Sequence, residues 1–155
     1  LSTWEKRLIE LALDAVGKIC EGCKEDERKS FRARARSLIS DMYASGVAYV
    51  VSLAAARSSA RAVELGLTAN SLDDIIVKLC GDREHVKELG LGGAEDRGYA
   101  LYGSLLLYAL RQAGVLSAGR LSEAIKSLWG NAAADRVALH AATWLKRFAE
   151  AYIYE

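Results

Sequence analysis

The chain has 155 residues, of which 52% are hydrophobic and 26% charged, and it contains no proline. This composition excludes an intrinsically disordered chain, and the length indicates one domain, residues 1–155, whose core needs no disulfide staples. The formal net charge of +1 indicates no charged partner by itself. Abundant alanine and leucine predict an all-α fold, which we expect to be a compact bundle of about six to seven helices.

The distribution of charged and apolar residues bears on location. Charged residues interrupt the segment Leu1–Leu13, which argues against a secretory leader. The longest apolar run, Gly46–Ala56, is too short to cross a bilayer. Three cysteines, an odd number, do not make a secreted disulfide framework. We therefore expect a cytoplasmic protein without a membrane partner.

The first predicted helix begins at a capping box formed by Ser2 and Glu5. Near its C-terminal end stand Cys20 and Cys23, whereas a thioredoxin-like Cys-x-x-Cys site needs a helix N-terminus. A zinc site needs four ligands, and the remaining cysteine and histidines have no paired spacing. We therefore predict no metal and no cofactor. Two alternatives stay open for the cysteines: a structural pair that includes Cys80, or simple burial.

The second predicted helix, Asp26–Ala44, carries a stripe of cations. By the helical period, four of them fall within about 100° of arc beside its apolar residues: Arg28, Lys29, Arg32 and Arg36. Arg34 points elsewhere, and Asp41 is the only acidic residue of this helix from Arg28 onward. Such a stripe suits a phosphate backbone, and the alternative is a solvated, salt-bridged face. We favour contact with an anion or a nucleic acid.

Gly46 is predicted to interrupt the helical pattern, which resumes as a short apolar helix ending near Arg57. Arg57 and Arg61 share a helix face because they are four residues apart, so they can extend the basic stripe. Farther along, Ser71 is expected to cap a short helix, and Leu89–Gly93 to form a loop.

Ala94–Ala113 is the strongest interior helix, and Gly114 is expected to close it. Tyr99 and Tyr102 fall on its core-facing stripe, so we predict that they pack in the core rather than stack on bases. A short helix over Ser122–Trp129 follows.

The last predicted helix, Asp135–Tyr154, is the element that we expect to hold the others together. Trp144, Phe148 and Tyr152 lie on its apolar face and would bury a large area. Arg147 lies on the polar stripe beside that face.

No arrangement of catalytic residues is visible. His85 and His140 are the only histidines, and no serine or cysteine is paired with either along the chain. The neighbouring carboxylates Asp73–Asp74 and Glu95–Asp96 do not face one another on a helix. We therefore predict that the protein is not an enzyme.

Three stretches are similar to one known family. Arg36–Arg57 combines a basic helix, a glycine turn and an apolar helix; Tyr99–Leu110 is rich in tyrosine and leucine; and Trp144–Ala151 lies near the C-terminus. Together they resemble the small, all-helical subunit of the Cmr effector complex of type III-B CRISPR systems.

The resemblance implies a non-catalytic subunit in antiviral defence that stacks in several copies along a ribonucleoprotein filament. Its implied partners are other Cmr subunits, guide RNA, target RNA and copies of itself. Carried onto this chain, the resemblance and the charge pattern give these candidate RNA-binding residues: Lys29, Arg32, Arg36, Arg57, Arg61, Lys146 and Arg147. Two other functions stay open: a helical protein–protein adaptor without RNA contact, and a small thiol enzyme built on Cys20 and Cys23.

Overall fold

The computed structural model describes residues 2–81 and 83–154, and all the regular secondary structure in these ranges is helical. In chain order the elements are α1 (Thr3–Gly22), α2 (Glu25–Arg57), α3 (Ala60–Thr68), α4 (Leu72–Ile76), the π-helix η1 (Val77–Gly81), α5 (Arg83–Glu88), α6 (Ala94–Gln112), α7 (Leu121–Leu128) and α8 (Ala132–Tyr152). The predicted all-α bundle is therefore confirmed.

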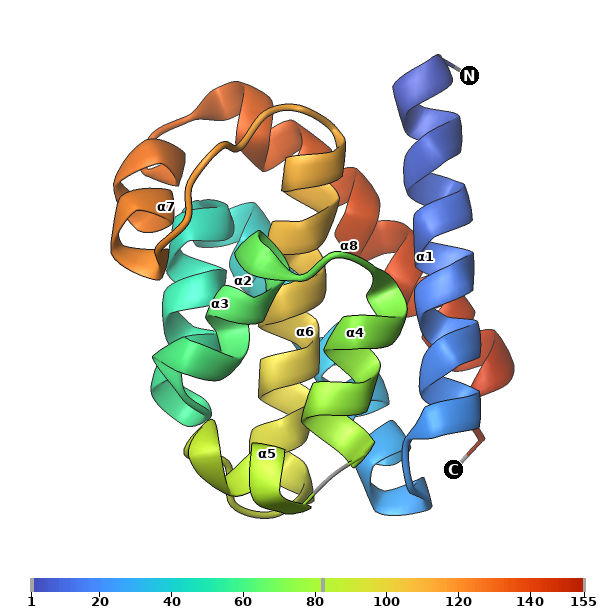
Figure 1. The fold of residues 1–155 in the computed structure, drawn as a ribbon. Coiled ribbons are helices and arrows are strands. Elements are labelled where there is room, and N and C mark those ends of the chain that lie inside the picture. The colour runs from blue at the N-terminus through green and yellow to red at the C-terminus, as the bar shows by residue number, and fades with distance from the viewer. Residues whose placement is uncertain (1, 82, 155) are drawn as a thin grey trace.

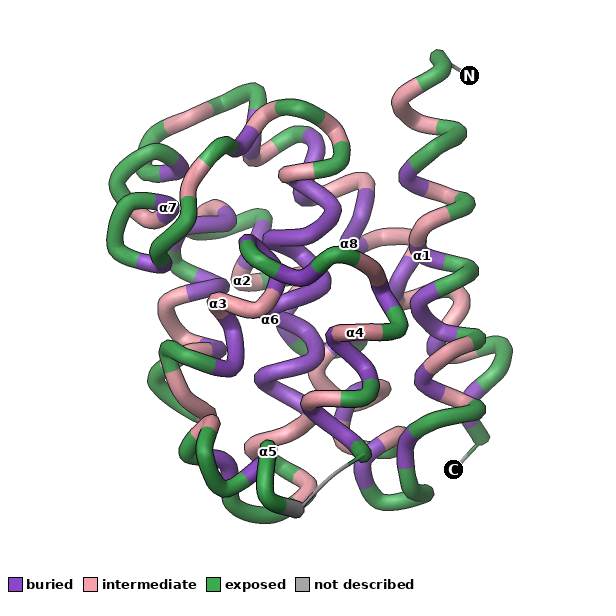
Figure 2. The backbone as a smooth tube through the Cα atoms, viewed as in Figure 1, coloured by how far each residue is buried: buried purple, intermediate pink, exposed green. Residues whose placement is uncertain are grey.

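The centre of the bundle is α6, and the other helices surround it (Figure 1). All 13 residues from Gly98 to Leu110 are buried, and none of them is charged, as Figure 2 shows by the continuous buried trace. A helix that is apolar all round has to be covered on every side, and α2, α3 and α8 supply this cover. We expected the last helix to take the central place, but α8 instead bridges α1 and α2.

The helix ends follow local capping chemistry. The predicted capping box of Ser2 and Glu5 begins α1, and the predicted cap Ser71 begins α4. Tyr99 and Tyr102 are buried, as expected. The last helix, however, begins before the predicted Asp135, because Asn131 accepts a hydrogen bond from the N–H of Ala134 at 3.1 Å. Tyr152 is 54% exposed, so it does not belong to the buried face.

The element α2 is a hairpin rather than one straight rod. Gly46 has φ 84° and ψ 173°, a conformation in practice restricted to glycine. The guanidinium carbons of Arg34 and Arg57 lie 4.6 Å and 5.3 Å from the centre of the Tyr99 ring. In a straight helix, residues this far apart in sequence would be separated by about 35 Å. The chain therefore folds back at Gly46, as the predicted interruption requires.

This hairpin also bears on membrane insertion. By length and composition alone α2 is a candidate membrane span, and 39% of its apolar 18-residue stretch is buried. Every such stretch of α2 with at most two charged residues includes Gly46. The apolar segment is therefore divided between two helices that run in opposite directions.

The second arm of the hairpin receives its N-terminal cap from another helix. The N–H of Val47 donates to Oδ1 of Asp135 in α8 at 2.9 Å. A Cβ atom on Gly46 would lie 3.0 Å from the same carboxylate oxygen. Asp135 thus satisfies one of the backbone donors that a new helix leaves open.

A disulfide joins Cys23 to Cys80, with 5.0 Å between their Cα atoms. It connects the corner between α1 and α2 to η1, so the structural pair that includes Cys80 is confirmed. Cys20 is a free thiol whose pKa is raised, chiefly by burial. Structural disulfides persist in oxidising compartments and inside hyperthermophile cells, so the cytoplasmic location stays a prediction.

We predict that Asp135→Ala lowers the free energy of unfolding by about 1 kcal/mol, because the N–H of Val47 loses its acceptor. Urea denaturation followed by circular dichroism measures this change. Asp135→Asn, which keeps an acceptor oxygen, should lose less. The control is Asp14→Ala, which removes an exposed carboxylate without a hydrogen bond among the described residues. Equal losses for Asp14→Ala and Asp135→Ala would contradict the assigned cap.

Reducing the disulfide is expected to lower the free energy of unfolding by about 4 kcal/mol, because its half-cystines are 57 residues apart and the unfolded chain gains freedom. The measurement compares urea midpoints of the oxidised and dithiothreitol-reduced Cys20→Ser variant, both in a metal chelator. This variant excludes exchange with the third cysteine. Identical midpoints would show that the bond does not stabilise the fold.

Candidate nucleic-acid interface

Three predicted RNA-binding residues line one surface hollow on the first arm of α2. Lys29, Arg32 and Arg36, together with Ala33, enclose about 280 Å³. Their spacing of three and four residues places them on one helix face, as the sequence pattern requires. The hollow therefore presents several positive charges to the same small volume.

A neighbouring hollow joins α2 to α8. Its charged lining residues are Arg34, Arg36, Lys146 and Glu150, and its volume is about 470 Å³. Arg36 lines both hollows, so the two are adjacent at this side chain. We call this region the basic surface and define it by the cations that line either hollow: Lys29, Arg32, Arg34, Arg36 and Lys146.

One exposed and one partly exposed carboxylate, Glu25 and Glu150, lie against the basic surface. Nε of Arg36 is 3.2 Å from Oε2 of Glu150, and Nζ of Lys29 is 3.0 Å from Oε1 of Glu25. Ion pairs between exposed groups contribute at most about 1 kcal/mol, because water and salt screen them. A phosphate can therefore exchange with either carboxylate at small cost.

Arg57 reaches the edge of the basic surface through Tyr99. One guanidinium nitrogen of Arg34 donates to the Tyr99 hydroxyl at 2.5 Å, and the guanidinium groups of Arg34 and Arg57 both lie near that ring. Arg57 also donates to Oε1 of Glu95 at 3.2 Å. Arg57 is thus connected to the stripe through the buried Tyr99 ring, and it also forms an ion pair with Glu95.

The remaining two predicted residues line neither hollow. Arg61 donates to the backbone carbonyl of Glu88 at 3.3 Å, so it contacts the end of α5. Arg147 is exposed, and its guanidinium carbon lies 4.9 Å from the centre of the Trp144 ring. Of the C-terminal pair, only Lys146 lies on the basic surface.

Sequence reasoning missed two members of this region. Arg34 was expected to point away from the stripe; it does contact Tyr99, but it also lines the hollow shared with α8. The position of Glu150 beside Arg36 depends on how α8 packs against α2, and no local sequence signal indicates it.

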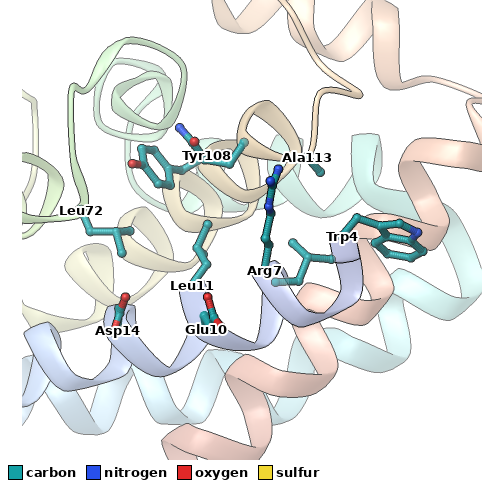
Figure 3. Close-up of a pocket in the computed structure, with 10 residues that line it drawn as sticks. Trp4, Arg7, Glu10, Leu11, Asp14, Leu72, Tyr108 and Ala113 are labelled. Atoms are coloured by element: carbon teal, nitrogen blue, oxygen red, sulfur yellow. The ribbon is translucent and has the colours of Figure 1, made fainter. Parts of the chain in front are cut away.

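A groove between α1, α4 and α6 is the second candidate site (Figure 3). It has a volume of about 440 Å³ and an apolar floor that includes Leu8, Leu11 and Leu72. Three polar side chains at this groove make no hydrogen bond or ion pair with the rest of the described chain: Arg7, Glu10 and Gln112. None of the residues lining the groove is a histidine, serine or cysteine, so it has no nucleophile–base pair.

Comparison with protein-family models, with curated proteins and with solved structures finds no match for this chain. The family resemblance therefore rests on the three sequence stretches.

We predict that Glu150→Gln strengthens binding to a polyanion, because Arg36 and Lys146 lose a neighbouring negative charge. The salt concentration that elutes the protein from immobilised heparin measures the effect and should rise. Glu123→Gln is the matched control, since it changes the net charge equally on the exposed side of α7. Equal shifts for the two variants would show that net charge alone determines retention.

Proposed function

We propose that the protein is a non-catalytic, RNA-contacting subunit of an RNA-guided effector complex of the type III-B CRISPR (Cmr) kind, acting in antiviral defence. The observation that carries the proposal is the basic surface, on which α2 and α8 gather five cations around two adjacent hollows. The resemblance of three stretches to the Cmr small subunit supports the same function.

The chemistry of the basic surface suits an RNA backbone. Arginine presents a planar fork of donors that matches two phosphate oxygens, and three of the five cations are arginines. Contacts to phosphate need no base-reading motif and are independent of sequence. A subunit that holds a guide–target duplex of any sequence needs this kind of contact.

The proposal also includes the partners. Guide RNA and target RNA occupy the basic surface, other Cmr subunits flank it, and further copies of the chain stack beside it. Arg147, which is exposed next to the basic surface residue Lys146, is available to RNA or to the next copy. Arg61 has a structural role rather than an RNA contact, because it donates a hydrogen bond to the backbone carbonyl of Glu88.

The groove between α1, α4 and α6 favours a second candidate function, that of a helical adaptor between proteins. Its apolar floor and its polar rim, where Arg7, Glu10 and Gln112 make no hydrogen bond or ion pair within the described chain, are typical of a surface for another polypeptide. An adaptor of this kind binds mainly by apolar burial, so its affinity changes little with salt, whereas phosphate contact weakens steeply.

We predict that Arg32→Glu and Arg36→Glu each weaken target-RNA binding by the assembled complex. In the milder variants Lys29→Gln and Arg36→Gln, the slope of log affinity against log salt should fall by about 0.7 to 0.9 for each phosphate contact removed. Filter binding at several salt concentrations measures both quantities. Arg7→Gln, which removes a cation of the groove, is the control and should keep the full slope.

The first test of the assembly is a native pull-down from the protein's own cells, with RNase treatment and subunit counting. Recovery of several copies in a large particle with a short guide-like RNA is the expected result. Recovery as a free monomer, or with one protein partner and no RNA, would refute the proposal and leave the adaptor as the better function.

A further inference from the structure

Three buried side chains from distant parts of the chain meet at the disulfide. Cys23 follows α1, Glu27 lies in the first turn of α2, and Cys80 lies in η1. One sulfur or oxygen atom from each lies within 4.8 Å of the other two, and all three residues are buried. Two sulfurs and a carboxylate oxygen are ligands that Zn²⁺ accepts.

We propose that the reduced protein binds one Zn²⁺ ion through Cys23, Cys80 and Glu27, so that the metal replaces the disulfide as the link between the α1–α2 corner and η1. This site goes beyond the proposed RNA contact and does not depend on it. None of its three residues lines the basic surface or the groove.

The Glu27 carboxylate is held in place by hydrogen bonds to both of its oxygens. Its Oε1 accepts the backbone N–H of Lys24 at 2.8 Å, and Arg97 donates to its Oε2. A carboxylate has about four acceptor positions, so two remain for a metal. Carboxylate ligands of metals are in turn held by hydrogen bonds of this kind, which fix their direction.

The two cysteines can exchange a disulfide for a metal with little change of the backbone. Sulfurs bound to one tetrahedral Zn²⁺ at about 2.3 Å lie roughly 3.8 Å apart. The Cα atoms of Cys23 and Cys80 are 5.0 Å apart, so rotation of the two side chains supplies the extra separation. A water molecule takes the fourth position, as in other zinc sites with three protein ligands.

The exchange balances in electrons and protons. A dithiol reductant gives two electrons to the disulfide, which becomes two thiols while the dithiol becomes a disulfide. Zn²⁺ then binds both sulfurs as thiolates and releases their two protons. The same corner is therefore linked by a covalent bond under oxidising conditions and by the metal under reducing conditions.

Cys20 provides the matched control. It is a neighbouring cysteine outside the set of three ligands, and its sulfur lies 3.7 Å from the backbone oxygen of Tyr152. Cys20→Ser should therefore keep the site. Cys80→Ser removes a ligand, and Glu27→Gln should weaken the metal affinity of the reduced protein by at least tenfold.

The experiment titrates Co²⁺ into the reduced, full-length protein without oxygen and then displaces it with Zn²⁺. One Co²⁺ per chain, with a sulfur-to-cobalt absorption band that the oxidised protein lacks, is the expected result for the wild type and for Cys20→Ser. No metal uptake by the reduced wild type, or loss of the band in Cys20→Ser, would overturn the proposal.

Cys80→Ser and Glu27→Gln also remove contacts that support the fold. The ligands are therefore identified from the metal coordination of the wild-type protein. X-ray absorption of the zinc-loaded protein should show two sulfur neighbours at about 2.3 Å and oxygen neighbours at about 2.0–2.2 Å. Three or more sulfurs, or none, would overturn the assignment of the ligands.

Discussion

The burial of α6 on every side is the constraint on which the rest of the fold depends. Its uncharged run from Gly98 to Leu110 has to lose contact with water all round, and one neighbouring helix cannot cover it. The hairpin in α2 supplies two arms for this purpose. The α3 backbone approaches α6 closely because residue 66 is glycine, where a Cβ atom would collide with the carbonyl oxygen of Ser104. Packing around α6 thus determines which surfaces remain free.

The basic surface follows from this arrangement. The first arm of α2 turns its apolar residues, such as Phe31 and Leu38, into the core, and its cations stay outside. Because α8 also packs against α2, Lys146 and Glu150 come beside Arg36. Tyr99 connects the two regions, since its ring is buried in α6 while the guanidinium groups of α2 lie near it. The charged surface is in this way attached to the most extensively buried helix.

Local signals allowed much of the fold and four of the five cations of the basic surface to be predicted. Caps such as Ser2 and Ser71 act within one turn, and the cation stripe follows from the helical period. The burial of α6 was also predictable, because no charge interrupts its middle, but the central place was expected of the last helix. The ion pair of Arg36 with Glu150 and the cap from Asp135 could not be predicted, since each joins helices far apart in the sequence. The pairing of Cys23 with Cys80 also depends on the packing, so the sequence left it open.

The cap that Asp135 gives to Val47 has a consequence for the order of folding during synthesis. The two groups are 88 residues apart, so the second arm of the hairpin leaves the ribosome long before its cap exists. Until α8 is made, that arm has no acceptor for its first backbone donor, and α6 has no cover on the side of α8. The N-terminal helices therefore complete their packing only after α8 has been synthesised.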